Sequence, residues 1–318
     1  MTPLRPLGAN GATDMTTLPY GTPPAGYRLP AETRLGRVVL QIADLDRSVA
    51  YYTAVLGFRL LARTPSTVVL GAADDTPLVE LHQLAGARAA TRRGRLGLYH
   101  FAILLPDRAS LGRFVAHLDR VGAYAGAADH LVSEALYLTD PDGLGIEVYA
   151  DRPRERWAVR GREIVMATEP LDLADLVRAG GTEEWNGLPR GTAVGHVHLH
   201  VGDLEAAAAF YHQGLGLDAV VSSYPGALFL SAGGYHHHLG LNTWAGPDAA
   251  PAAPDDARLL EWNLELPSAA DAEAAAASLK RAGHAAERAG GGWTVRDPWG
   301  TPLRLSGMPQ GNSQTRNR

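Results

Sequence analysis

One carboxylate, Glu147, stands in an otherwise apolar, strand-like run at residues 145–149. Because side chains alternate between the two faces of a strand, Glu147 points away from Ile146 and Val148. If Glu147 lies on the inner face of the sheet, its carboxylate needs a partner. The alternative interpretation is that Glu147 lies at a strand end, in water or in an ion pair. The chain has twelve histidines and no cysteine, so any metal chemistry falls to histidine and carboxylate.

The sequence before this strand is suited to a tight turn. In Asp140-Pro141-Asp142-Gly143, the proline presets φ, the aspartates can bond local backbone, and the glycine tolerates a positive φ. We therefore expect a hairpin whose second strand carries Glu147.

The elements around this hairpin belong to a repeat that occurs four times. Each copy begins with a strand-like run that leads into a helix N-cap, and these runs are residues 36–44, 99–107, 195–203 and 260–268. The expected caps are Asp44, Asp107, Asp203 and Ser268, and the helices follow at 48–56, 110–121, 204–215 and 269–282. Three short strand-like runs come after each helix. The sequence thus predicts an α+β protein of four βαβββ units, each of which must pack against another unit to cover its sheet.

The spacing of the repeats predicts the domain boundaries. We expect a disordered arm at residues 1–33, two units at 34–150, a linker at 151–192, two units at 193–306 and a disordered tail at 307–318. The charged run at 151–157 is interpreted as linker in preference to a segment that closes a site.

Composition narrows the functional class. The apolar share of 46% and the charged share of 20% are typical of a globular protein, and a net charge of −5 offers no basic surface for nucleic acid. No run is long enough to span a membrane, and the N-terminal residues lack the apolar segment of a signal peptide. We therefore expect a cytoplasmic protein with no nucleic-acid or membrane partner.

The repeat, the histidine on its first strand and the Asp-Pro-Asp-Gly hairpin before a glutamate together resemble the vicinal oxygen chelate superfamily. That superfamily includes glyoxalases and extradiol ring-cleaving dioxygenases, and the resemblance covers about residues 35–306. Three longer stretches, 97–106, 129–157 and 231–242, are similar to two-domain bacterial proteins of the catechol-2,3-dioxygenase type. The resemblance implies four units that pair into two open mixed barrels.

In this superfamily the metal ligands lie on the first and last strands of paired units. The four units offer, in order, Arg37, His100, His196 and Glu261 on the first strand and Glu80, Glu147, Gly240 and Arg304 on the last. If sequence neighbours pair, each barrel holds one histidine beside a cation, and neither barrel makes a metal site. If instead the middle units pair and the outer units pair around them, His100, His196 and Glu147 meet, while the two cations and two anions of the outer units neutralise one another. We favour this nested pairing and keep the neighbour pairing as the alternative.

Two histidines and one carboxylate on one face leave open positions on iron, as in non-haem Fe(II) oxygenases, and the same ligands permit Mn(II). The alternative for His100 is a core histidine bonded to backbone. The resemblance implies that a small aromatic diol binds the iron through both oxygens, that O₂ binds beside it, and that the ring opens next to the diol, a reaction of aromatic hydrocarbon catabolism.

The same resemblance points to the acid/base and to hydrogen-bond donors. His237 aligns best with the residue that takes the catechol proton and returns it, and His238 is the reserve, although strand alternation would require a bulge to point His237 inward. Tyr137 and His130 match residues that donate hydrogen bonds to the diol and to bound oxygen. A core position for Tyr137 and a surface position for His130 are the alternatives.

The favoured function is therefore an Fe(II)-dependent extradiol dioxygenase. The alternatives are a metal-dependent isomerase or lyase of the glyoxalase type, against which Gly240 counts because it supplies no carboxylate, and a binding protein for an aromatic ligand. The sequence leaves the oligomeric state open, including a homo-oligomer.

Overall fold

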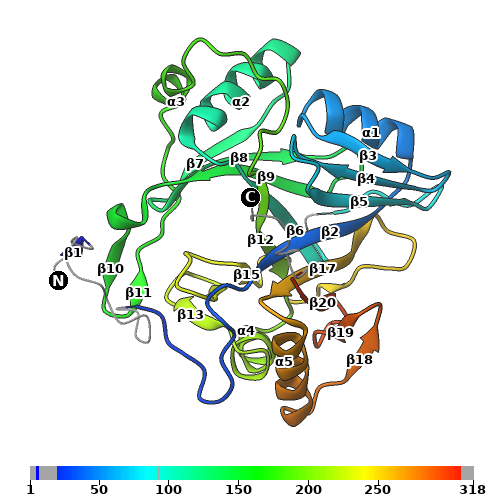
Figure 1. Ribbon diagram of the computed structural model, residues 1–318, viewed down its shortest axis with the longest axis vertical. Helices are drawn as coiled ribbons and strands as arrows, with labels where there is room; N and C mark the ends of the chain where they lie inside the picture. Colours follow the sequence, from blue (N-terminus) through cyan, green and yellow to red (C-terminus); the bar gives the residue numbers. More distant parts are fainter. Residues whose placement is uncertain (1–4, 7–19, 92, 309–318) are drawn as a thin grey trace, which may run out of the picture.

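The computed structural model describes residues 5–6, 20–91 and 93–308 (Figure 1). The four predicted units are present. The first comprises β2 (Arg34–Ile42), α1 (Leu45–Ala54), β3 (Arg59–Arg63), β4 (Thr67–Gly71) and β5 (Pro77–Gln83). The second comprises β6 (Arg95–Leu104), α2 (Arg108–Val121), β7 (Gly126–Asp129), β8 (Ser133–Thr139) and β9 (Gly145–Asp151).

The third unit comprises β12 (Ala193–His200), α4 (Leu204–Ala207), which continues as the π-helical turn η2 (Ala208–Gly214), β13 (Asp218–Val221), β14 (Ala227–Ser231) and β15 (Leu239–Asn242). The fourth comprises β17 (Arg258–Leu266), α5 (Ala269–Arg281), β18 (Ala286–Ala289), β19 (Gly292–Arg296) and β20 (Pro302–Gly307). All four predicted N-caps are confirmed, because the side chains of Asp44, Asp107, Asp203 and Ser268 each accept a backbone N–H three residues ahead.

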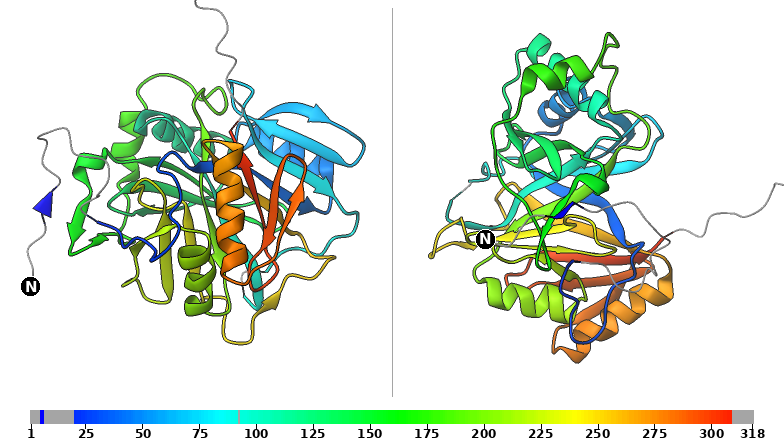
Figure 2. Two further views of the ribbon diagram at one scale, coloured as in Figure 1. Left: turned by 60° about the horizontal axis from the view of Figure 1, so that its bottom comes forward. Right: turned by 90° about the vertical axis from the view of Figure 1, so that its left-hand side faces the viewer.

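The units pair in the nested order. One sheet runs β13-β14-β15-β12-β6-β9-β8-β7 and joins units two and three, while the other runs β18-β19-β20-β17-β2-β5-β4-β3 and joins units one and four. Each sheet curls into a half-open barrel, and helices α1 and α2 lie at one end of the molecule with α4 and α5 at the other (Figure 2). The short strand β16 (Ala250–Pro251) adds to β6. Each pair of neighbouring units in the sequence thus contributes one unit to each sheet.

The charges of the outer units pair as the nested order predicts. Arg37 lies 3.1 Å from Glu80, and Arg304 lies 3.8 Å from Glu261. The face that would correspond to a metal site in this second sheet is thus occupied by ion pairs.

Two equivalent hydrogen bonds join unit one to unit two and unit three to unit four. The hydroxyl of Tyr52 on α1 donates to Asp140 in the turn of unit two at 3.2 Å, and the hydroxyl of Tyr211 on η2 donates to Asp297 in the turn of unit four at 3.0 Å. The turn that delivers Glu147 is therefore anchored to the other sheet.

The prediction of a disordered arm is wrong for residues 20–33. Tyr20 and Leu29 are buried, Tyr20 donates to the carbonyl of Gly234, and Arg28 pairs with Asp218 at 2.7 Å. These residues are ordered because their apolar side chains pack against unit three. The short strand β1 (Arg5–Pro6) pairs with β10 (Ala158–Arg160), and the rest of the arm lies outside the described residues.

At the other end, Gly307 belongs to β20, and Met308 donates its N–H to Leu266. Residues 309–318 of the predicted tail lie outside the described part of the chain.

The connection at 151–192 folds back on the two middle units instead of running free. It contains the 3₁₀ turn η1 (Arg154–Arg156), β10, β11 (Glu163–Ile164) and α3 (Leu173–Ala179). Helix α3 packs so closely on α2 that a Cβ at Gly112 would lie 2.1 Å from the carbonyl of Leu176. The charged run at 151–157, interpreted above as linker, packs against the loop that carries the three consecutive histidines. Among the described helices, none has the length and apolar character to cross a membrane.

Candidate metal centre and pocket

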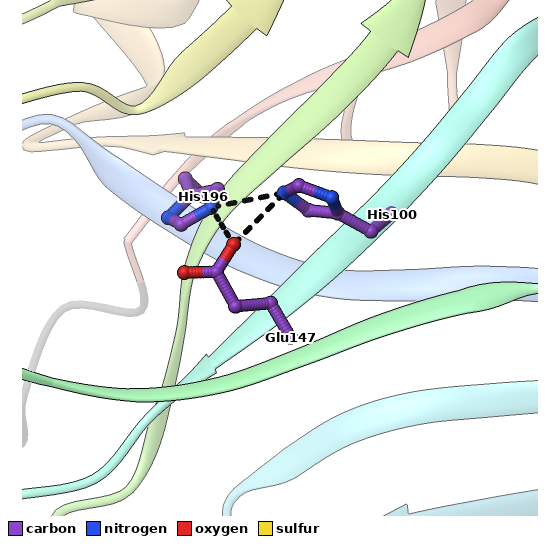
Figure 3. A group of neighbouring side chains, drawn as sticks. All are labelled: His100, Glu147 and His196. Atoms are coloured by element: carbon purple, nitrogen blue, oxygen red, sulfur yellow. Dashed lines mark hydrogen bonds and ion pairs between the residues drawn. The ribbon is translucent and has the colours of Figure 1, made fainter. Parts of the chain in front are cut away.

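Three side chains from three adjacent strands converge on one point (Figure 3). Nε2 of His100 lies 3.0 Å from Oε2 of Glu147, Nε2 of His196 lies 3.1 Å from the same oxygen, and the two nitrogens lie 3.3 Å apart. All three residues are buried. These atoms form a nearly equilateral triangle.

The register of the strands explains this convergence. Ala102 on β6 pairs with His196 on β12 and with Glu147 on β9, so these three residues form a row across the sheet. Directly paired residues share a face, and the small side chain of Ala102 leaves its two neighbours room to meet above it. His100, two residues before Ala102, points to the same face.

The protonation states suit metal ligation. Burial lowers the pKa of His100, and the hydrogen bond that its ring donates to Glu147 offsets this only in part, so the ring is neutral. Burial raises the pKa of Glu147, but the adjacent imidazoles of His196 and His100 lower it by more, so its pKa lies well below the usual range. A neutral imidazole and an ionised carboxylate are the forms that bind a metal.

The geometry fits a metal ion. Metal–ligand bonds of roughly 2.1 Å at right angles place neighbouring ligand atoms about 3.0 Å apart, close to the three separations here. The other ring nitrogen of His196, Nδ1, is buried without a hydrogen-bond partner among the described residues. Nε2, which lies in the triangle, is the ligand atom that this ring presents.

A cavity of about 380 Å³ opens beside this triangle on the concave face of the sheet. Its wall includes His100, Glu147, His130, Tyr137, His198, His237, Tyr99, Tyr224, Phe229, Trp244 and residues 126–128 and 166–168. Among the described residues, none of those that line this cavity is a lysine or an arginine. The cavity therefore offers a ligand an aromatic and apolar surface with a few polar groups gathered near the triangle.

The sequence comparisons agree with this architecture. Residues 34–148 and 193–305 match the Glyoxalase/Bleomycin resistance protein/Dioxygenase superfamily. The chain belongs to this superfamily. It is also 45% identical over 271 residues to the catechol-2,3-dioxygenase of Bacillus subtilis, an alignment that covers 84% of this chain and 94% of that protein.

Two solved structures share the fold. A putative dioxygenase from Bacillus subtilis has a TM-score of 0.63 at 13% identity, covering 90% of this chain and 87% of that chain. Glyoxalase I from Zea mays has a TM-score of 0.52 at 20% identity, covering 86% of this chain and 92% of that chain.

In this superfamily member Tyr137 and His130 lie together at the pocket wall. Nδ1 of His130 donates to the carbonyl of Ala167 at 2.7 Å, and its Nε2 lies 2.5 Å from the Tyr137 hydroxyl. Because a carbonyl only accepts, Nε2 of a neutral His130 accepts from the hydroxyl. Burial, together with the nearby Glu147 carboxylate, raises the pKa of Tyr137 well above its usual range, so the phenol stays protonated.

The three consecutive histidines do not lie on a strand. β15 begins at Leu239, so residues 236–238 form an irregular approach to it, and the alternation rule does not apply to them. His237 faces the pocket, where its ring lies 4.1 Å from that of His196. The structure does not support His238 as the reserve acid/base. Its side chain lies outside this pocket, and its Nδ1 accepts a hydrogen bond from the N–H of Ala232.

Sequence reasoning missed part of the pocket wall. Tyr99, Tyr224 and Phe229 were not anticipated, and Met166 and Thr168 come from the connection between the halves. The connection lies outside the four repeats, so no pattern in the sequence indicated that Met166 and Thr168 would line the pocket. The aromatic residues belong to the repeats, but their alternation does not distinguish pocket from core.

Proposed function

We propose that this protein is an Fe(II)-dependent extradiol dioxygenase that opens the ring of catechol-type aromatics with both atoms of O₂. The observation that carries the proposal is the buried triangle of His100, His196 and Glu147, which has the ligand types and spacing of a two-histidine, one-carboxylate site. The 45% identity to a catechol-2,3-dioxygenase over most of the chain supports an oxidoreductase of this class.

When bound, the iron would supply the redox chemistry that brings the diol and O₂ to react, and Mn(II) could occupy the same ligands. The chain's own groups would handle protons and orientation. His237, at the pocket wall beside His196, would take a proton from the diol and return it later. Burial and the neighbouring imidazoles hold the pKa of His237 well below its usual range, so its ring starts neutral, as a base must.

On the other side of the pocket, the Tyr137 hydroxyl would turn its hydrogen from Nε2 of His130 to developing negative charge on the substrate, while His130 would orient the phenol. Their hydrogen bond, and the one from His130 to the Ala167 carbonyl, preorganise the phenol before substrate arrives. The aromatic wall formed by Tyr99, Tyr224 and Trp244 would exclude water and stack against the substrate ring. The proposed partners are thus a small aromatic diol and O₂. A cytoplasmic location and a homo-oligomer remain predictions.

The decisive experiment loads metal-free protein with Fe(II) under anaerobic conditions and then adds catechol and air. A yellow ring-opened product and matching O₂ uptake are expected with Fe(II), together with about one iron per chain by metal analysis. His196→Ala should lose both the iron and the product. A buried Val→Ala change on the outer sheet, Val79→Ala, is the matched control for a core truncation away from the site.

Other outcomes point to the alternatives. Metal-dependent conversion of a thiol adduct without O₂ uptake would favour a glyoxalase-type isomerase. Tight diol binding that is unchanged in His196→Ala, with no product under any metal, would favour a binding protein.

A further inference from the structure

A chain of buried hydrogen bonds leads from His237 away from the pocket. Nδ1 of His237 lies 2.8 Å from Nδ1 of His236, and Nε2 of His236 lies 2.8 Å from Oδ1 of Asp151. The hydroxyl of Tyr235 donates to the same Asp151 oxygen at 3.2 Å. His236 is fully buried, whereas Asp151 is about one quarter exposed and lines a second, outward-facing cavity.

The directions of these hydrogen bonds follow from their chemistry. A carboxylate oxygen only accepts, so Nε2 of His236 carries a proton and donates it to Asp151. In a neutral ring, Nδ1 of His236 then accepts, and its partner, Nδ1 of His237, must be the donor. This leaves Nε2 of His237 without a proton, and Nε2 is the nitrogen that remains to face the pocket.

The packing around both rings holds this arrangement. The ring of His237 lies between His196, at 4.1 Å, and Phe229, at 5.0 Å. The ring of His236 is enclosed by Tyr235, at 4.1 Å, and Trp157, at 5.4 Å. Turning either ring over would break its hydrogen bonds.

The strand β9 positions Asp151, the carboxylate at which this series of hydrogen bonds ends. Glu147, Tyr149 and Asp151 are alternate residues of β9, so they point to the same face. The hydroxyl of Tyr149 lies 2.6 Å from that of Tyr235, which bonds Asp151. One strand therefore supplies both the proposed metal ligand and the group that orients the proposed base.

We propose that Asp151 is a positioning residue, which acts through His236 to hold His237 in the tautomer with Nδ1 protonated and Nε2 free. The consequence for catalysis rests on the proposed function, in which Nε2 of His237 receives the diol proton. The tautomer itself is a property of the folded chain and needs no substrate.

The first test reads the tautomer directly. In metal-free protein labelled with ¹⁵N-histidine, long-range ¹H–¹⁵N spectra should show His237, assigned by its loss in His237→Gln, with a protonated Nδ1 and a bare Nε2. Asp151→Leu should abolish this pattern, whereas Asp151→Asn should keep it because an amide oxygen also accepts from His236. Glu155→Leu, which removes an exposed carboxylate four residues along the same segment, is the matched control and should change nothing.

The second test separates positioning from binding. In iron-loaded protein, Asp151→Leu should lower kcat by about 10- to 100-fold, the range typical for partners that orient a site residue. Iron content and the Kd for catechol, titrated anaerobically, should stay within about twofold. Asp151→Asn should restore most of kcat.

Several results would overturn the proposal. A wild-type spectrum with the proton on Nε2 of His237 does so without any variant, and so does an unchanged tautomer or an unchanged kcat in Asp151→Leu. Asp151→Ala replaces the leucine variant if the latter does not fold. If the tautomer behaves as expected but no variant opens catechol, the proposed function fails and the positioning role stands.

Discussion

Gly240 lies directly against the imidazole of His198, so that a Cβ at position 240 would be 2.8 Å from Cγ of that ring. The two residues are register partners on β15 and β12, just as Glu147 and Ala102 are on β9 and β6. Unit two combines a small residue on its first strand with a carboxylate on its last, and unit three combines an imidazole with a glycine. As a result, the sheet of units two and three places one carboxylate, Glu147, beside His100 and His196.

Gly240→Ala should be destabilising, because the new methyl group would overlap the His198 ring, which is held by a 2.9 Å hydrogen bond between Asn242 and its Nε2. We expect a loss of about 1–3 kcal/mol in the free energy of unfolding, measured by denaturant titration. Gly26→Ala, at a glycine with nothing within 4 Å of the added Cβ, is the control and should stay within about 0.5 kcal/mol. Equal stabilities of the two variants would contradict the close contact.

The double variant His198→Ala, Gly240→Glu would copy the arrangement of unit two into unit three. A second carboxylate would then face the metal position, so we expect tighter metal binding and a strong loss of ring cleavage, because fewer positions stay open for the diol and O₂. Metal affinity by competition with a chelator and product formation are the two measurements. Retention of full activity would show that position 240 does not face the metal.

Metal binding should stabilise the fold. At a free Fe(II) concentration 100 times the Kd, binding to the folded chain alone adds about 2.7 kcal/mol to the free energy of unfolding. Removal of iron by a chelator should therefore lower the melting temperature of the wild type, and Glu147→Gln should show no such dependence on iron. Glu261→Gln, at an ion pair of the outer sheet, is the control and should respond to iron as the wild type does.

Stability should depend on pH through Asp140. Burial raises the pKa of Asp140 from 3.8 to about 6, against the lowering effect of backbone N–H donors from Leu144 and Asp142. Because the folded-state pKa is the higher one, the folded chain binds this proton more tightly. The stabilisation is therefore complete below the unfolded value near 3.8 and is lost as the pH rises through about 6. The difference corresponds to roughly 3 kcal/mol.

Asp140→Asn removes this titration while keeping an oxygen for the two backbone donors. The variant should thus gain stability relative to the wild type between pH 4 and pH 7, measured by denaturant titration at each pH. Asp46→Asn, at an exposed carboxylate, is the control for a generic change of charge. A stability difference between Asp140→Asn and wild type that does not change with pH would contradict the raised pKa.

Much of the site could be predicted because its determinants are local. The caps at Asp44, Asp107, Asp203 and Ser268 follow from residue type and position, and all four form. The turn at 140–143 and the alternation in β9 correctly predict that Glu147 faces inward. Matching strand positions in the repeats then single out His100 and His196 as its companions.

The misassignments arose where contacts are non-local or where the backbone is irregular. Tyr20 and Leu29 are ordered by packing against unit three, which is almost two hundred residues away in the chain. The sequence placed residues 236–238 on a strand, whereas they form the loop before β15, and this loop turns the expected His237 inward. The connection contributes Met166 and Thr168 to the pocket only because it folds back across the open end of the sheet.

The sequence by itself determined the four repeated units, the residue types available for a metal and the hairpin that presents Glu147, because periodicity, capping and turn chemistry act over a few neighbouring residues. Only the tertiary structure decided which units share a sheet, which of three adjacent histidines enters the pocket, and that Asp151 reaches His237 through His236. An unpaired sheet edge offers the same backbone donors and acceptors to either possible partner unit. Which two units pair is therefore determined by the side chains that come into contact in the folded chain.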